Sequence, residues 1–398
     1  MKKVVFLVDM NAFFISCEMT RNDSLVGVPA AVAGDPKKRT GIILAANYEA
    51  RSHGVKTAMV VHEALKRCPE MILLSPDQAF YKQKSRDVME LLSNYSPIIE
   101  QNSIDEAWLD MTGSEGLFGS PVNAAKCIMD DIKNSLGLWC SIGIAENKFL
   151  SKMASDMKKP LGITELWKHD IPMKLWPMPV RTMHGVGVKT AEKLGRIGIE
   201  TIGDLANYDV GVLIRTFGKN GNVIYRHANG IDSSPLLPHL ANDMKSIGRE
   251  KTLSENISDI TKAKNILIEL ADDIGMSARN HEKKGRTVQI TLKYSDFRVV
   301  TRQKTLTPTT NTTKEIYRAG CSLLEENWNR NHSVRLIGLS LSGFNEEASL
   351  NQLSFFDRIE TTIKDDKNER IDQAMDKIRK KHGTEIITLA SLVKKKAL

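Results

Sequence analysis

Short apolar runs alternate with amphipathic stretches along the first part of the chain. A continuous apolar run predicts a buried strand, and apolar residues at helical spacing predict a helix. Strands are expected at 4–8, 42–46, 71–74 and 140–145, and helices at 80–92, 122–136 and 148–157. Residues 98–111 are expected to form two strands joined by a tight turn near Ile104 and Asp105. This alternation is typical of an α/β or α+β domain.

Proline-rich segments divide the rest of the chain. Boundaries are predicted near 172–179 and at 233–238, with a helical, glycine-rich stretch between them. From 245 to 343 the expected order is strand, helix, two strands joined by a hairpin, helix and strand. This is the β-α-β-β-α-β order of a ferredoxin-like unit. Beyond Phe344 the chain is polar, and a helix expected at 368–381 is interpreted as a solvated tail.

Composition and charge narrow the class of protein. With 398 residues, of which 41% are hydrophobic and 26% charged, the chain is typical of a soluble protein of several domains. No apolar run approaches the roughly 20 residues that span a bilayer. The run 4–8 is also too short for a secretory signal, so a cytosolic protein without membrane contact is expected. The formal charge of +8 suits a polyanionic partner such as nucleic acid.

The cysteines give no sign of a disulfide framework or a zinc site. The chain has five, none at C-x-x-C spacing: Cys17, Cys68, Cys127, Cys140 and Cys321. An odd, scattered set of this kind is typical of buried small hydrophobic residues.

Three carboxylates lie beside predicted strands. Asp9 follows the first apolar run, and Asp105 and Glu106 lie at the turn within 98–111. If the three meet at one sheet edge, their mutual repulsion must be offset. Two Mg²⁺ ions about 4 Å apart would offset it and would align a hydroxyl with a phosphate ester. The alternative, in which Asp9 caps a helix and the other two lie in a solvated turn, is about equally supported by these residues alone.

Several motifs resemble those of one family in order and spacing. Residues 8–18 (VDMNAFFISCE) resemble the first motif of the Y-family DNA polymerases, and 46–55 (ANYEARSHGV) resemble their nucleotide-binding motif. Residues 103–110 (SIDEAWLD) resemble the catalytic motif, and Asn147-Lys148 with 155–160 (SDMKKP) the end of the palm. The resemblance covers residues 1 to about 345 and is closest to the DinB, or DNA polymerase IV, branch.

The resemblance implies a role for each motif residue. Asp9 and Asp105 would bridge both metals, Glu106 would hold the one that activates the primer 3′-hydroxyl, and the Met10 carbonyl would complete the set. Tyr48, Arg51 and Lys159 would bind the triphosphate.

Two aromatic residues follow the first motif's carboxylate. Phe14 would be the steric gate that excludes a 2′-hydroxyl, with Phe13 beside it in the nucleotide site or, more simply, in the core. Asn11 and Trp108 depart from the family, where Asp and Tyr or Phe are common.

Contacts to DNA are expected in two later regions. Residues 180–194 resemble a helix-hairpin-helix, in which Gly185, Gly187 and Lys189 would contact a backbone phosphate. The ferredoxin-like unit would be the family's little finger, and its strands carry several basic residues. We expect DNA contacts from Arg249, Lys251, Arg298 and Arg302. The other basic strand residues are Arg286, Lys293 and Lys304. Gln352, Leu353, Phe355 and Phe356 resemble the short peptide by which bacterial polymerases bind the sliding clamp.

The implied architecture is an α+β, multidomain right-hand polymerase. A ferredoxin-like palm is expected at 1–10 and 78–165, small fingers at 11–77, a helical thumb with the helix-hairpin-helix at 166–232, a ferredoxin-like little finger at 243–344, and a tail with the clamp peptide at 345–398.

The implied activity is low-fidelity, template-directed synthesis that bypasses damaged bases, without a proofreading exonuclease. It would use primer-template DNA, dNTPs and two Mg²⁺, or Mn²⁺, as a monomer in the bacterial cytosol or nucleoid. A nucleotide cyclase shares palm-like two-metal carboxylates but needs no helix-hairpin-helix or basic second domain. A non-catalytic DNA scaffold would need a broken site, whereas Asp9, Asp105, Glu106, Arg51 and Lys159 are intact.

Overall fold

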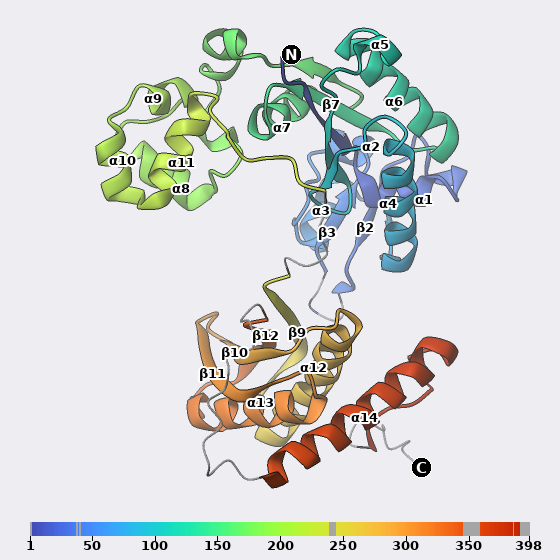
Figure 1. The fold of residues 1–398 in the computed structure, drawn as a ribbon, viewed down its shortest axis with the longest axis vertical. Coiled ribbons are helices and arrows are strands. Elements are labelled where there is room, and N and C mark those ends of the chain that lie inside the picture. The colour runs from blue at the N-terminus through green and yellow to red at the C-terminus, as the bar shows by residue number, and fades with distance from the viewer. Residues whose placement is uncertain are drawn as a thin grey trace. The chain divides into compact units, whose positions relative to one another are not determined.

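The computed structural model describes residues 2–36, 39, 41–238, 244–344, 359–384 and 386–390, with side chains in the last helix from Lys367. The chain forms two compact units, one of residues 1–35 and 41–240 and the other of 36–40 and 241–398 (Figure 1). Within the described residues, none of the helices is both long and apolar enough to cross a membrane.

A five-stranded sheet forms the centre of the first unit. Its order is β5-β6-β1-β7-β8, with β1 at Val5–Met10, β5 at Ile99–Gln101, β6 at Glu106–Asp110, β7 at Cys140–Ala145 and β8 at Ile163–Glu165. β1 is antiparallel to both β6 and β7. All six residues of β1 are buried because both faces of the sheet are covered, which explains the unbroken apolar run.

Helices cover the two faces of this sheet. On one side, α4 (Gln78–Leu92) and α6 (Pro121–Leu136) share a core with Phe6 and Val8. On the other side, α7 (Lys148–Met157) packs directly on β1 and β7. The close approach requires Gly143, since a Cβ there would lie 2.0 Å from the carbonyl oxygen of Ser151.

Two smaller parts complete the first unit. A three-stranded sheet, β3-β2-β4, consists of Ala30–Ala33 (β2), Ile43–Ala46 (β3) and Ile72–Leu74 (β4), and shares a core with α2 (Tyr48–Ser52) and α3 (Val61–Arg67). Helix α1 (Phe13–Met19) contacts β2, β3 and α4, and α5 spans Glu115–Phe118. The helical part contains α8 (Val188–Gly195), α9 (Ile202–Ala206), α10 (Val210–Phe217) and α11 (Lys219–Ala228).

The second unit has the predicted β-α-β-β-α-β order. Its elements are β9 (Ser246–Ile257), α12 (Ile260–Asn280), β10 (Gly285–Tyr294), β11 (Val299–Thr310), α13 (Thr313–Asn327) and β12 (Val334–Ser342). The sheet order is β11-β10-β12-β9, with every neighbouring pair antiparallel. Both helices share one core with the buried side chains of this sheet.

The last helix, α14 (Ile359–His382), corrects the prediction of a solvated tail. It begins earlier than predicted and packs against α12 (Figure 1). The buried guanidinium of Arg279 on α12 pairs with Asp372 at 3.0 Å and Asp376 at 2.6 Å. In the reverse direction, Arg379 of α14 pairs with Asp272 of α12 at 2.8 Å. Helix α14 is rich in charged residues, but its buried charges pair with residues of α12. It is therefore part of the second unit.

Candidate active site

Strand register brings the predicted carboxylates together. Asp9 near the end of β1 lies directly opposite Glu106 at the start of β6, in an antiparallel pair. The amide of Met10 donates to the carbonyl oxygen of Asp105 at 2.9 Å, which closes the turn against β1. The hydroxyl of Ser103 donates to the Asp105 carboxylate at 2.5 Å. The three acids therefore meet at one end of two paired strands, which is the first of the two arrangements that the sequence left open.

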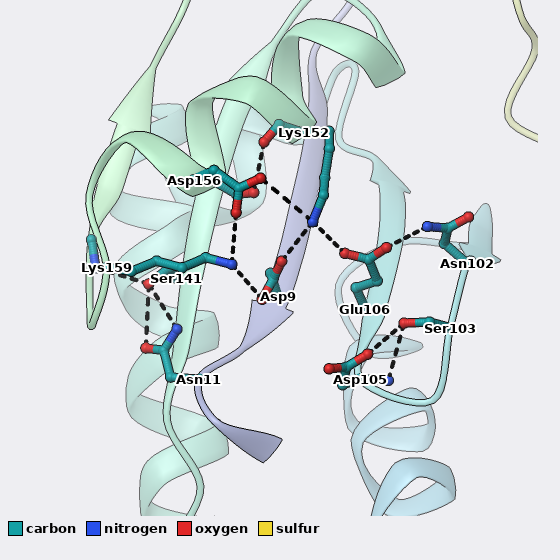
Figure 2. A network of polar contacts seen from close by, with 12 residues as sticks. Asp9, Asn11, Asn102, Ser103, Asp105, Glu106, Ser141, Lys152, Asp156 and Lys159 are labelled. Carbon is teal, nitrogen blue, oxygen red and sulfur yellow. Dashed lines mark hydrogen bonds and ion pairs between the residues drawn. The ribbon is translucent and has the colours of Figure 1, made fainter. Parts of the chain in front are cut away.

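Two lysines lie among these acids (Figure 2). The ammonium of Lys152, reaching from α7, lies 2.8 Å from Asp9 Oδ2 and 2.6 Å from Glu106 Oε2. Lys159, just beyond α7, lies 2.8 Å from Asp9 Oδ1 and 2.8 Å from Asp156. Neither Lys152 nor Asp156 was predicted as a site residue, although Asp156 lies within the motif 155–160. Both residues lie in the predicted helix 148–157, but helical spacing does not show how near that helix comes to the carboxylates.

The ion pairs set the protonation states of the site. Burial alone would raise the pKa of Asp9, but Lys159 and Lys152 outweigh it and hold that pKa below its ordinary value. Burial would lower the pKa of Lys152, but Asp9 and Glu106 raise it. The pKa of Lys159 is likewise raised by Asp9 and Asp156 against the effect of burial. At neutral pH, Asp9 is therefore ionised and both lysines are charged.

The donor set fits divalent metal ions. Asp9, Asp105 and Glu106 supply carboxylate oxygens, the hard ligands that Mg²⁺ and Mn²⁺ prefer, and Met10 lines the same cavity. The Lys152 ammonium already bridges Asp9 and Glu106, which shows that a cation fits between these two carboxylates.

A cavity of about 490 Å³ opens beside the carboxylates. Its lining includes all the predicted catalytic and nucleotide-binding residues: Asp9, Met10, Phe13, Phe14, Tyr48, Arg51, Asp105, Glu106 and Lys159. The hydroxyl of Tyr48 is buried and has no hydrogen-bond partner, and burial raises its pKa. Arg51 is held toward the strand end by a 2.8 Å bond from Nε to the carbonyl oxygen of Ala46. A buried hydroxyl without a partner is unusual and fits a site that binds an acceptor-rich ligand.

The two phenylalanines differ in exposure. Phe14 is half-buried and stacks on Tyr81 with ring centroids 4.4 Å apart. Phe13 is only 3% exposed and belongs mainly to the core of the first unit. Both rings line the cavity, and Phe14 is the more exposed of the two.

The two departures from the family pattern have structural explanations. Asn11 is buried and uses both ends of its amide, donating to Ser141 Oγ at 3.0 Å and accepting from the amide of Leu161 at 2.9 Å. An aspartate could accept but not donate in this position. Trp108 is buried and its indole N–H donates to the Lys148 carbonyl oxygen at 3.2 Å, so the larger ring keeps its polar atom satisfied.

The predicted DNA-contacting residues lie in both units. In the first unit, Gly185 has a φ of +88°, Gly187 is the N-cap of α8, and the side chain of Lys189 is exposed. In the second unit, Arg249 and Lys251 share a sheet face with buried Ile247 and Leu253, which is the face that packs on the helices, and Lys251 pairs with Glu269 of α12.

Basic residues of β11, at the opposite edge of this sheet, also share a sheet face with buried residues. Arg302 and Lys304 lie opposite buried Ile290 and Val288. Near the hairpin, Lys293 lies over the ring of Phe297 and Arg298 over that of Tyr294.

The predicted clamp-binding peptide falls outside the described residues, and it comprises Gln352, Leu353, Phe355 and Phe356.

Comparisons with known proteins agree with these features. The sequence model of the impB/mucB/samB family matches residues 8–156, the C-terminal domain of that family matches 244–355, and the DNA polymerase-iota thumb domain matches 181–232. Two similar proteins named DNA polymerase IV are those of Alkaliphilus oremlandii, 60% identical over 99% of this chain and 100% of the relative, and Clostridium kluyveri, 58% identical over 99% of each. A solved Y-family DNA polymerase chimera superposes with a TM-score of 0.78 and 26% identity, covering 86% of this chain and 100% of the other.

Proposed function

Because the chain belongs to the DNA polymerase IV branch of the Y-family, whose members are DNA-directed translesion polymerases, we propose that it extends a primer by two-metal nucleotidyl transfer at Asp9, Asp105 and Glu106. The family depends on divalent metal and uses primer-template DNA and dNTPs. The observation that carries the proposal is the convergence of the three carboxylates, Tyr48, Arg51 and Lys159 on one cavity.

The carboxylates and the Met10 carbonyl would hold two ions, which we propose are Mg²⁺, with Mn²⁺ as a substitute. Bound there, the ions would lower the pKa of the primer 3′-hydroxyl and stabilise the negative charge on the phosphate. The 3′-hydroxyl then attacks the α-phosphate in line, and pyrophosphate leaves.

Tyr48, Arg51 and Lys159 would bind the triphosphate. The unpartnered Tyr48 hydroxyl can donate to a phosphate oxygen, and Arg51 offers a planar, permanently charged donor. Lys159 would leave its ion pairs with Asp9 and Asp156 and contact the phosphates of the leaving pyrophosphate. There its positive charge would stabilise the developing negative charge.

Phe14 would select deoxynucleotides by occupying the space of a 2′-hydroxyl. Phe14→Ala should increase ribonucleotide incorporation relative to deoxynucleotide incorporation in primer extension. Phe80→Ala, at another half-buried ring beside Tyr81, is the matched control and should leave the sugar preference unchanged. A Phe14→Ala enzyme that still rejects ribonucleotides would contradict the assignment.

Low fidelity and the lack of proofreading form part of the same proposal. Ala45, a small side chain, lines the cavity and would leave space around a bound base pair. Copying of undamaged templates at replicative accuracy, or release of dNMP from a mismatched primer end, would contradict it.

Basic groups of the thumb and little finger would bind the DNA backbone without sequence preference. Affinity should then fall steeply with salt, because each phosphate contact releases counterions. The protein would act as a monomer in the cytosol.

The peptide at 352–356 would bind the sliding clamp. Truncation before Gln352 would also remove α14, which packs on the second unit, so it would test two things at once. The sharper variant is Phe355→Ala/Phe356→Ala, which should lose stimulation by the clamp while retaining basal activity. Full stimulation of this variant would exclude the peptide as the clamp contact.

The decisive experiment is primer extension with Mg²⁺ and dNTPs by the intact chain and by Asp105→Ala/Glu106→Ala. We expect extension by the intact chain alone, with DNA binding retained by both. Extension by the double variant would remove the metal assignment. Tight DNA binding without extension by either protein would favour a scaffold, and cyclisation of a nucleotide without DNA would favour a cyclase.

A further inference from the structure

A second group of metal-ligating side chains lies outside the catalytic cavity. His53 follows α2, Cys68 follows α3, and Glu70 lies in the turn before β4. One ligand atom from each, the imidazole nitrogen, the thiol sulfur and a carboxylate oxygen, lies within 4.8 Å of the other two. The mechanism proposed above uses none of these three side chains.

The spacing of these atoms is close to that of a tetrahedral site. Metal–ligand bonds of about 2.0–2.3 Å place the ligand atoms of a tetrahedron roughly 3.3–3.8 Å apart. Cys68 Sγ lies 3.4 Å from Glu70 Oε1, and His53 Nε2 lies 3.9 Å from the same oxygen. Small side-chain rotations would therefore suffice to close the set around an ion.

The backbone that carries these ligands is fixed. The amide of His53 donates to the Ala50 carbonyl oxygen, and that of Cys68 to the Ala64 carbonyl oxygen. Ala50, Ala64 and Cys68 belong to one buried core with the three-stranded sheet. His53 and Glu70 are exposed, whereas Cys68 is fully buried, so an ion would reach the thiol only once the exposed His53 and Glu70 side chains move, and it would retain a water as its fourth ligand.

We propose that His53, Cys68 and Glu70 form a binding site for one divalent ion that accepts thiolate and imidazole ligands, such as Zn²⁺. A thiolate with an imidazole and a carboxylate favours Zn²⁺ over Mg²⁺, which prefers oxygen ligands alone. Binding releases the thiol proton that Cys68 donates to Glu70 and replaces it with a metal–sulfur bond. No C-x-x-C spacing marks this site, because the fold, and not a local motif, brings the three ligands together.

The site would join two parts of the small sheet domain. The ion would link the end of α2 to the turn between α3 and β4. Tyr48 and Arg51, which line the catalytic cavity, lie on this same short helix.

Co²⁺ is a spectroscopic probe for this site, because only a thiolate ligand gives the strong near-ultraviolet sulfur-to-cobalt absorption. The full-length chain, stripped of metal and held in excess Mg²⁺ to occupy the catalytic carboxylates, would be titrated with Co²⁺ and then with Zn²⁺. We expect one equivalent of Co²⁺ with the thiolate band, and loss of the band on addition of one equivalent of Zn²⁺.

Variants separate this site from other cysteines. Cys68→Ser should remove the band, whereas Cys127→Ser, at an exposed cysteine elsewhere, should retain it. Because Cys68 is buried and its substitution can disturb folding, the exposed ligands provide a second test. His53→Gln and Glu70→Gln should each weaken Co²⁺ binding by at least about tenfold. A chain without the band, a band that persists in Cys68→Ser, or unchanged affinity in both exposed-ligand variants would overturn the proposal.

Discussion

The Lys152 ammonium lies between Asp9 and Glu106, where we propose that a metal ion binds, so removal of this ammonium should have opposite effects on the stability of the metal-free protein and on its affinity for metal. Lys152→Gln keeps a side chain of similar length but removes the charge. In the metal-free protein, Asp9 and Glu106 then face each other across the strand pair, and only Asp9 keeps a lysine partner, Lys159.

The magnitude follows from burial and the surviving partner. The side chains of Lys152, Asp9 and Glu106 are 13%, 10% and 12% exposed. Breaking a fully buried pair costs about 3–5 kcal/mol. Because these groups retain some solvent and Lys159 still pairs with Asp9, we expect a loss of about 2 kcal/mol. For a unit of this size that corresponds to a fall of roughly 4–8 °C in the melting temperature.

Metal binding should change in the other direction. At the proposed metal site, a divalent ion would have to displace the Lys152 ammonium from Asp9 and Glu106, so a variant without the ammonium lacks this competitor. If about 1.4 kcal/mol of that competition is lost, Mg²⁺ binds about tenfold more tightly. Thermal denaturation of the DNA-free protein over a Mg²⁺ series measures both effects, as a lower melting temperature without metal and saturation at lower Mg²⁺.

Lys148→Gln is the matched control. Lys148 lies one turn earlier on α7 and pairs with Glu100 at 2.7 Å, with similar burial. This variant should lose stability without any change in its Mg²⁺ response. If Lys152→Gln and Lys148→Gln respond identically to Mg²⁺, the ammonium does not compete with metal and the reasoning fails.

Three further predictions concern stability. Arg279→Met leaves two acids of α14 without their buried partner and should lower the free energy of unfolding of the second unit by about 3–5 kcal/mol, measured by urea denaturation. The control Lys284→Met, at an exposed pair with Glu369, should lower it by less than about 1 kcal/mol. Equal losses in the two variants would show that Arg279 does not hold α14. Burial lowers the pKa of His227 below 6.5, so the unfolded chain binds more protons there and stability falls as pH drops from about 6.5 toward the folded-state pKa. His227→Gln should flatten that part of the curve of stability against pH, and an unchanged slope would exclude His227 as its source. Gly143→Ala forces α7 away from β7 and should lower both the melting temperature and the rate of primer extension, whereas wild-type values for both would show that the sheet accommodates the methyl group.

The carboxylates were predictable because their positions depend on strand ends. Asp9 follows an unbroken apolar run and Glu106 starts another, so pairing of the two strands is sufficient to bring them together. The family resemblance that these residues suggested is confirmed by the comparisons. The individual roles of the site residues remain predictions.

Lys152 could not be predicted in the same way. A lysine in an amphipathic helix is ordinarily solvated. Its position depends on how closely α7 lies on β7, which is set by Gly143 and by the backbone of Ser151. This is a packing distance, and the periodicity of the sequence does not encode it.

Helix α14 shows a second limit. Asp372 and Arg379 are buried although both are charged, because α12 supplies their partners far away in the sequence. A hydropathy pattern treats such residues as exposed. The prediction of a solvated tail was therefore wrong for a specific reason, namely that burial here rests on charge pairing.

The opposed positions of Asp9 and Glu106 also restrict how the gene can change. Successive side chains of a strand point to opposite faces, so loss of one codon within 5–8 would shift the alternation of β1. Both faces of the sheet are covered, so the apolar residues would stay buried on either face, but Asp9 would lose its position opposite Glu106. Over evolutionary time, β1 can therefore exchange one apolar residue for another far more readily than it can change length.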